Sequence, residues 1–158
     1  MQDKKSPQEA AKSLLVFEND MLLGIPAIDD QHKEFYLIYN TLIGNIAKRG
    51  DTPVDLGPVI HDIYNYYINH FQLEELVMRH VGYPFLREHK KAHRDIFARL
   101  DELSIRLAER SITLDEVLLE LRTTASSHFR EIDRGIGIHY RIWLRSHPEG
   151  APMGHSGG

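Results

Sequence analysis

Four segments of this chain repeat apolar residues with the period of an α-helix, and each segment also carries a histidine on its apolar face. After His32, for example, apolar residues follow at offsets of 3, 4, 7, 10, 11 and 14, which trace one side of a helix. The segments span residues 29–48, 52–81 (with a start anywhere up to 58), 84–109 and 113–133. Four amphipathic helices of about 20 residues, each about 30 Å long, must bury these faces against one another.

Turn signals separate the segments by short distances, which favours antiparallel neighbours. Gly50 closes the first segment, Gly82 and Pro84 divide the second from the third, and Thr113 with Glu116 forms a capping box for the fourth. These features predict an all-α fold. The expected architecture is an antiparallel up-down-up-down four-helix bundle with an N-terminal arm and a short C-terminal helix.

We expect a single domain over residues 1–158. Gly135 and Gly137 should weaken the fourth helix after Asp133, and the Gly- and Pro-rich C-terminus should be disordered. The predicted parts are therefore an arm, the bundle, a short helix and a disordered tail, at residues 1–28, 29–134, 138–145 and 147–158. The arm should dock on the bundle through Leu14, Leu15, Phe17, Leu22 and Leu23.

The composition excludes several classes of function. The chain has no cysteine, which rules out disulfides, thiolate metal sites and cysteine nucleophiles. Its net charge is −4 without a basic block, so we expect no nucleic-acid partner. No segment approaches the roughly 20 apolar residues that cross a bilayer, and the N-terminus lacks the apolar run of a signal peptide. We therefore expect a cytoplasmic protein without membrane contact.

Histidine is the compositional anomaly, with ten residues in a chain of 158. Five of them fall in phase with the apolar faces, as does the carboxylate of Glu74. A lone histidine on an apolar face is more often a satisfied core residue than a ligand. Burying six such groups without strong partners, however, would cost about 1–3 kcal/mol each, against a total stability of roughly 5–15 kcal/mol. We therefore predict a metal site formed by His32, His70, Glu74, His89, His93, His128 and Asp133.

The number and type of these ligands indicate the kind of centre. Imidazole and carboxylate without thiolate suit iron, manganese, zinc or copper better than calcium or magnesium. Seven ligands exceed the needs of one ion and suit two. If both ions are six-coordinate, and if Glu74, Asp133 and an oxide or hydroxide bridge them, one position stays open on the ion with fewer histidines. The pattern thus predicts a dinuclear centre that can take one small ligand.

The residues around these positions resemble those of bacterial hemerythrins. The similarity covers about residues 17–133 and rests on Gly24-Ile25-Pro26-Ala27-Ile28-Asp29-Asp30-Gln31-His32, on His70-Phe71-Gln72-Leu73-Glu74-Glu75 with Met78 and Tyr83-Pro84, on His89-x-x-x-His93 and on His128-x-x-x-x-Asp133. The resemblance implies two iron ions with a bridging oxo or hydroxo group and O₂ as the ligand. It also implies that His89, His93 and His128 hold one iron, that His32 and His70 hold the iron with the open position, and that Glu74 and Asp133 bridge.

The spacing of the last two ligands conflicts with a regular helix. Five residues of ideal helix turn by about 500°, which would place Asp133 about 140° around the axis from His128. Both residues reach one site only if the helix unwinds locally. We therefore predict a π-bulge between them, a distortion that often occurs at functional sites.

The chain departs from the hemerythrin pattern beside the fourth-helix histidine. Thr124 and Ala125 stand where the family usually has Trp and a bulky Leu, and two serines follow. In the family these positions line the O₂ pocket, and smaller, more polar residues there should admit water, which promotes oxidation of the irons. We therefore expect faster autoxidation than in relatives that have Trp and Leu.

Reversible O₂ binding for storage, delivery or sensing is the function that the resemblance implies. The alternative is an enzyme at the same centre: an oxidase, a peroxidase or a nitric-oxide-handling protein. A third hypothesis is an inert structural metal site, against which the open position argues. A sensor would need a protein partner or a homo-oligomer, contacted through the arm or through residues 138–145.

Six other polar residues are predicted to lie outside the ligand set, because of their helical phase, their distance along the helix or their position in the tail. They are His61, His80, His139, His147, His155 and Glu75, of which Glu75 is expected to face solvent or to support a ligand.

Overall fold

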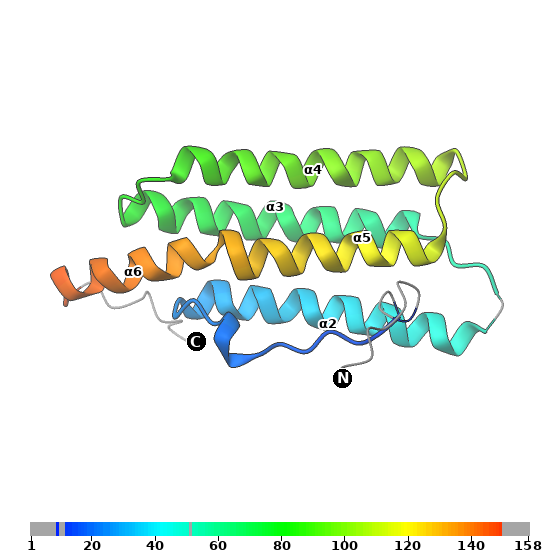
Figure 1. Cartoon of the computed structure of the whole chain (residues 1–158), viewed down its shortest axis with the longest axis horizontal. Helices are drawn as coiled ribbons and strands as arrows, with labels where there is room; N and C mark the ends of the chain where they lie inside the picture. Colours follow the sequence, from blue (N-terminus) through cyan, green and yellow to red (C-terminus); the bar gives the residue numbers. More distant parts are fainter. Residues whose placement is uncertain (1–8, 10–11, 51, 150–158) are drawn as a thin grey trace, which may run out of the picture.

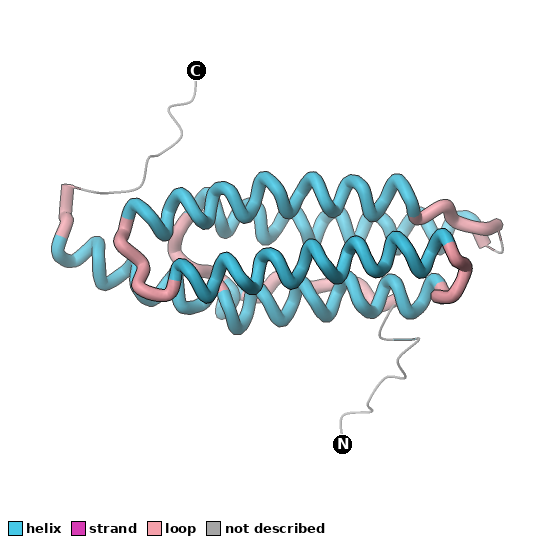
Figure 2. The backbone as a smooth tube through the Cα atoms, turned by 90° about the horizontal axis from the view of Figure 1, so that it is seen from above, coloured by secondary structure: helices cyan, strands magenta, loops and turns pink. Residues whose placement is uncertain are grey.

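The computed structural model describes residues 9, 12–50 and 52–149, and these residues form helices and loops without strands. Figure 1 shows four long helices side by side, with α2 and α4 running in one direction and α3 and α5 in the opposite one. Loops join them (Figure 2). The predicted all-α four-helix bundle is therefore confirmed. Its helices are α2 (Pro26–Arg49), α3 (Gly57–His80), α4 (Leu86–Ala108) and α5 (Leu114–Ser127).

Three shorter elements flank the bundle. A 3-10 turn, η1 (Asn19–Met21), precedes α2, while a π-helix, η2 (His128–Ile132), continues α5 and is followed by α6 (Arg134–Ser146). In Figure 1 α5, η2 and α6 form one rod, and α6 projects beyond the other helices. α6 begins four residues earlier than the predicted segment 138–145. Most of the predicted disordered tail, residues 150–158, lies outside the described residues, as do residues 1–8 of the arm.

Two glycines near the start of α6 explain why the expected break after Asp133 does not occur. A Cβ atom on Gly137 would lie 2.7 Å from the carbonyl oxygen of Leu23, and one on Gly135 would collide with the hydroxyl of Tyr83. These glycines therefore allow close packing of α6 rather than ending it. The contact offsets the helix propensity that glycine lacks, about 1 kcal/mol relative to alanine.

Local sequence accounts for the ends of the long helices. Thr113 and Glu116 form the predicted capping box of α5: the Thr113 side chain accepts from the Glu116 N–H, and Glu116 Oε2 accepts from the Thr113 N–H at 2.8 Å. α3 starts at Gly57, the later of the starts that the sequence left open. Gly82, with φ of +63°, takes the left-handed conformation that commonly follows a helix end.

The apolar helix faces form two clusters. The larger one fills the bundle between α2, α3, α4 and α5 and includes Phe35, Tyr67, Leu100 and Leu118. The smaller one lies toward α6 and includes Ile28, Met78, Ile136 and Tyr140. Along each helix the predicted ligands fall between these clusters, so apolar packing encloses them from both ends.

The segment before α2 runs along the outside of that helix (Figure 1). Asn40 of α2 holds it through two hydrogen bonds with the backbone of Leu15, at 2.8 and 2.9 Å. Leu15 and Leu23 are buried, and Phe17 packs against the core. An extended chain turns successive side chains to opposite sides, which explains how the inward side chain of Leu15 leaves its neighbours facing outward.

Two of the five residues that were predicted to dock this segment on the bundle are exposed instead. Leu14 is 60% exposed and Leu22 is 41% exposed, although both were expected to contact the bundle. Hydrophobicity alone does not show which side of an extended segment meets its partner. Among the described helices, none is both long enough and apolar enough to cross a membrane.

Gly137→Ala should lower the free energy of unfolding by about 1–3 kcal/mol, because the added methyl group overpacks against the backbone of Leu23. Gly44→Ala is the matched control: Gly44 lies inside α2, and apart from the backbone of α2 itself no neighbouring group lies within 4 Å of its Cβ position. That substitution should instead raise stability by about 0.5–1 kcal/mol. Urea unfolding measures both changes, and effects of the same sign and size would contradict the contact between α6 and Leu23.

Candidate metal centre

Three α-helices and the π-helix that continues α5 bring the seven predicted ligands together inside the bundle. None of the seven is more than 4% exposed. α2 contributes one histidine, α3 a histidine and a glutamate one turn apart, and α4 two histidines one turn apart. The last histidine begins η2 and the aspartate follows η2 directly. The residues are His32, His70, Glu74, His89, His93, His128 and Asp133.

The candidate ligand atoms form two groups of four that share Glu74. Within each group these atoms lie within 4.8 Å of one another, close enough to surround one metal ion. The first group contains Glu74, His89, His93 and His128, and the second contains His32, His70, Glu74 and Asp133.

Glu74 turns one carboxylate oxygen toward each group. Its Oε2 lies 3.0 Å from His93 Nε2 and 3.5 Å from His89 Nε2. Its Oε1 lies 3.4 Å from His70 Nε2 and 3.8 Å from His32 Nε2. A carboxylate in this orientation can offer one oxygen to each of two metal ions.

Asp133, which directly follows η2, also turns its two carboxylate oxygens toward different histidines. Its Oδ1 lies 3.0 Å from His128 Nε2 and 3.2 Å from His89 Nε2, while its Oδ2 lies 3.2 Å from His32 Nε2. Both carboxylates of the cluster therefore face imidazoles of both groups.

A π-turn places Asp133 in this position. The Asp133 N–H donates to the carbonyl oxygen of His128 at 3.0 Å, five residues earlier, and residues 128–132 form a π-helix. The predicted π-bulge is therefore confirmed. The extra residue also shifts the register, so Ile132, four residues after His128, is 39% exposed.

Burial and charge act in opposite directions on the pKa values of the cluster. Burial lowers the pKa of His32, but the adjacent carboxylates of Asp133 and Glu74 outweigh this effect and raise the pKa to about 9. The same balance raises the pKa of His128 to about 10. Burial would raise the carboxyl pKa values of Glu74 and Asp133, but the surrounding histidines hold both well below their ordinary range. Both groups are therefore anionic at neutral pH and attract cations.

His70 behaves differently, because burial lowers its pKa to about 4 and keeps the ring neutral. Its Nδ1 lies 3.0 Å from Gln31 Oε1, so this nitrogen carries the proton and donates it. His70 Nε2 is then an unprotonated acceptor that faces Glu74 Oε1 at 3.4 Å. Two acceptors that face each other are compatible when a cation lies between them.

The unsatisfied polar atoms of the structure fit a metal as their missing partner. In the described part of the chain, all buried side-chain nitrogen and oxygen atoms that lack a hydrogen bond belong to this cluster, apart from two hydroxyl groups. The atoms belong to His32, His70, Glu74, His89, His128 and Asp133. Imidazole and carboxylate donors suit a non-haem iron site, so the residues present fit that metal.

Two polar side chains support the histidines from outside the cluster. Gln31 Oε1 of α2 accepts a hydrogen bond from the Nδ1–H of His70 on α3. Glu75 Oε1 lies 3.4 Å from His93 Nδ1, and Glu75 Oε2 accepts from Lys90 Nζ at 2.6 Å. Gln31 was not predicted to support a ligand, although a polar residue directly before a buried histidine is a usable signal for such support.

The remaining histidines of the described chain lie away from the cluster. His61 is exposed, and His139 contacts a backbone carbonyl oxygen. The rings of His80 and His147 pack against the single tryptophan. His155 falls outside the described residues.

Comparison with known proteins agrees with this geometry. The family model described as "Hemerythrin HHE cation binding domain" matches residues 23–137. The chain is 29% identical over 148 residues to a protein named Bacteriohemerythrin from Stenotrophomonas maltophilia (strain R551-3), covering 91% of this chain and 95% of that protein. It is 33% identical over 121 residues to one of the same name from Pseudomonas paraeruginosa (strain DSM 24068 / PA7), covering 77% and 78%. No solved structure matches the chain significantly.

Gln31→Leu should weaken metal binding by roughly 10- to 100-fold, because the variant leaves His70 without the acceptor that orients its ring. Gln72→Leu, at an exposed position of α3, is the matched control and should bind metal as the native chain does. Metal analysis after competition with a graded series of chelators measures the difference. Equal retention of metal by the two variants would contradict a supporting role for Gln31.

Proposed function

We propose that this chain, which belongs to the hemerythrin family, binds O₂ reversibly at a non-haem di-iron centre for oxygen storage, delivery or sensing. The observation that carries the proposal is the orientation of the two buried carboxylates. Glu74 and Asp133 each turn one oxygen to each of two sets of imidazoles. This orientation favours a pair of metal ions over a single ion.

The two sets of imidazoles differ in number, which supports different roles for the two metal positions. In the proposed assignment Glu74 and Asp133 bridge. One iron is held by His89, His93 and His128, and the other by His32 and His70. The position with fewer histidines keeps room for a small ligand. When bound, the irons supply the electrons and the open coordination position that O₂ capture requires.

The protein itself orients the ligands and excludes water. The Phe71 ring stacks on the His93 ring with centroids 3.7 Å apart, and the Phe129 ring stacks on His32 at 4.1 Å. Each phenylalanine packs on an imidazole from a neighbouring helix, so the imidazole planes are fixed by contacts between helices. Burial also strengthens the attraction of the carboxylates for cations, because the local dielectric constant is low.

An enzyme at the same centre is the second candidate, and one feature favours it. Ala125 is completely buried, and the Thr124 hydroxyl is buried without a hydrogen-bond partner. A small side chain and a polar atom about one turn before His128 leave this wall more open to water or peroxide than bulky apolar residues would. Oxidase, peroxidase or nitric oxide chemistry would use this space.

Anaerobic reduction and O₂ titration of the iron-loaded protein test the proposal. The protein should hold about two irons per chain, as di-iron bundles do, and should develop a visible absorption band that disappears when O₂ is removed. Asp133→Asn should lose the band, whereas Asp101→Asn, at an exposed position of α4, should keep it. Rapid consumption of O₂ or peroxide would support the enzyme instead, and the absence of any spectral change would indicate an inert metal site.

Thr124→Val should slow the oxidative loss of that band, because it removes the buried hydroxyl and keeps the shape of the side chain. The expected change is roughly two- to tenfold, which corresponds to one hydrogen bond of about 0.5–1.5 kcal/mol. Thr123→Val, at an exposed neighbouring position, should leave the rate unchanged. The native chain should lose its oxygen-bound band faster than hemerythrins that have Trp and Leu at the positions of Thr124 and Ala125. An equally slow loss would contradict the entry of water along this wall.

A further inference from the structure

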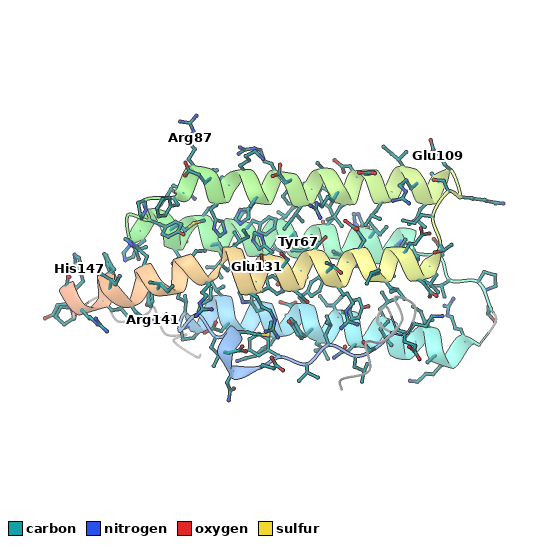
Figure 3. The ribbon with its side chains drawn as sticks, in the orientation of Figure 1. Tyr67, Arg87, Glu109, Glu131, Arg141 and His147 are labelled. Carbon is teal, nitrogen blue, oxygen red and sulfur yellow. The ribbon has the colours of Figure 1, made fainter. Side chains whose placement is uncertain are left out.

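Two buried hydroxyl groups outside the metal cluster lack a hydrogen-bond partner, and the residues that carry them line the same small cavity. They are Tyr67 Oη on α3 and Thr124 Oγ1 on α5, and no other buried side-chain polar atom outside the cluster is unsatisfied in the described chain. Tyr67 is 1% exposed and lies inside the bundle in Figure 3. Tyr67 and Thr124 come from different helices, and they line one cavity only because the bundle packs α3 beside α5.

The cavity has the size of a single water molecule. Its volume is about 10 Å³, near the lower limit of roughly 10–15 Å³ that holds one water. Apart from the two hydroxyls, its inner walls are apolar, and an Arg99–Glu120 ion pair of 3.5 Å lies at its exposed edge. The apolar wall residues are Ile96, Leu100, Leu103 and Leu121.

An empty cavity would leave both hydroxyls without partners, which is unfavourable for a buried polar group. A threonine inside a helix can instead bond to the carbonyl oxygen one turn earlier, but Thr124 makes no such bond. A buried water typically makes roughly two to four hydrogen bonds, and the two hydroxyls provide the first two. Water is therefore the ligand whose size and hydrogen bonding both fit.

We propose that Tyr67 and Thr124 together bind one ordered water molecule, which enters between α4 and α5 past Arg99 and Glu120. Each hydroxyl can donate to the water or accept from it, so the water satisfies both groups at once. The ligand of this site is water itself, held by side chains that take no part in the metal cluster.

The hydration site lies next to the metal cluster along the bundle axis. Tyr67 precedes His70 by three residues and Thr124 precedes His128 by four, which corresponds to about 5–6 Å of helix rise. The Phe71 ring lies between, with its centroid 5.0 Å from the Tyr67 ring and 3.7 Å from the His93 ring. Granting the proposed di-iron function, the site keeps one hydrogen-bonded water within about a turn of the centre.

A double-mutant cycle in urea unfolding, with matched metal content, tests the shared water. Tyr67→Phe and Thr124→Val should each raise the equilibrium constant for unfolding by roughly three- to tenfold, because the water loses a partner. The double variant should cost less than the product of the single effects, since the second hydroxyl has no bridging water left to lose. Thr123→Val is the matched control and should change the constant little.

Two outcomes would overturn the proposal. If the hydroxyls bind no water, removing either one should stabilise the protein, and the two effects should multiply independently. A crystal structure of the full chain that shows an empty cavity between Tyr67 and Thr124 would have the same meaning, whereas density for one water bonded to both supports the site. Neither measurement depends on O₂, so failure of the oxygen-binding proposal would leave this result unaffected.

Discussion

The burial of two carboxylates among five imidazoles is the constraint on which the rest of this structure depends. Glu74 and Asp133 are completely buried, and a buried charge is stable only where partners compensate it. Every long helix or its continuation supplies at least one of these partners. The carboxylates come from α3 and from the residue after η2, and most of the imidazoles that compensate their charge come from other helices. These contacts therefore hold the helices together at one level of the bundle.

The surrounding architecture preserves this arrangement. Two apolar clusters lie on either side of the polar level, and the aromatic rings of Phe71 and Phe129 pack directly on imidazoles. The π-turn at residues 128–132 is the local distortion that allows His128 and Asp133 to face the same point. A regular helix would have turned the carboxylate away, and the second group of ligand atoms would have lost one of its four members.

One wall of the bundle contains a small cavity with polar residues. Between α3, α4 and α5, Tyr67 and Thr124 line this cavity, which is about the size of one water, their hydroxyls have no hydrogen-bond partner, and the neighbouring Ala125 is small. Reversible O₂ capture benefits from a dry surrounding, whereas turnover of O₂ or peroxide requires protons. The polarity of this wall is therefore the feature of the chain that bears most directly on whether the centre binds O₂ reversibly or acts as an enzyme.

The sequence by itself determined the four helices, their order and the seven residues of the candidate centre, because helical period and turn chemistry are local properties. It also required the π-turn, since five residues of regular helix cannot bring His128 and Asp133 to one point. Only the tertiary structure decided that Leu14 and Leu22 face outward, that Gly137 packs on Leu23, and that Gln31 reaches His70. The same holds for the cavity shared by Tyr67 and Thr124. Each of these features is a contact between segments that are separate in sequence, and no periodicity within one segment specifies where another segment will lie.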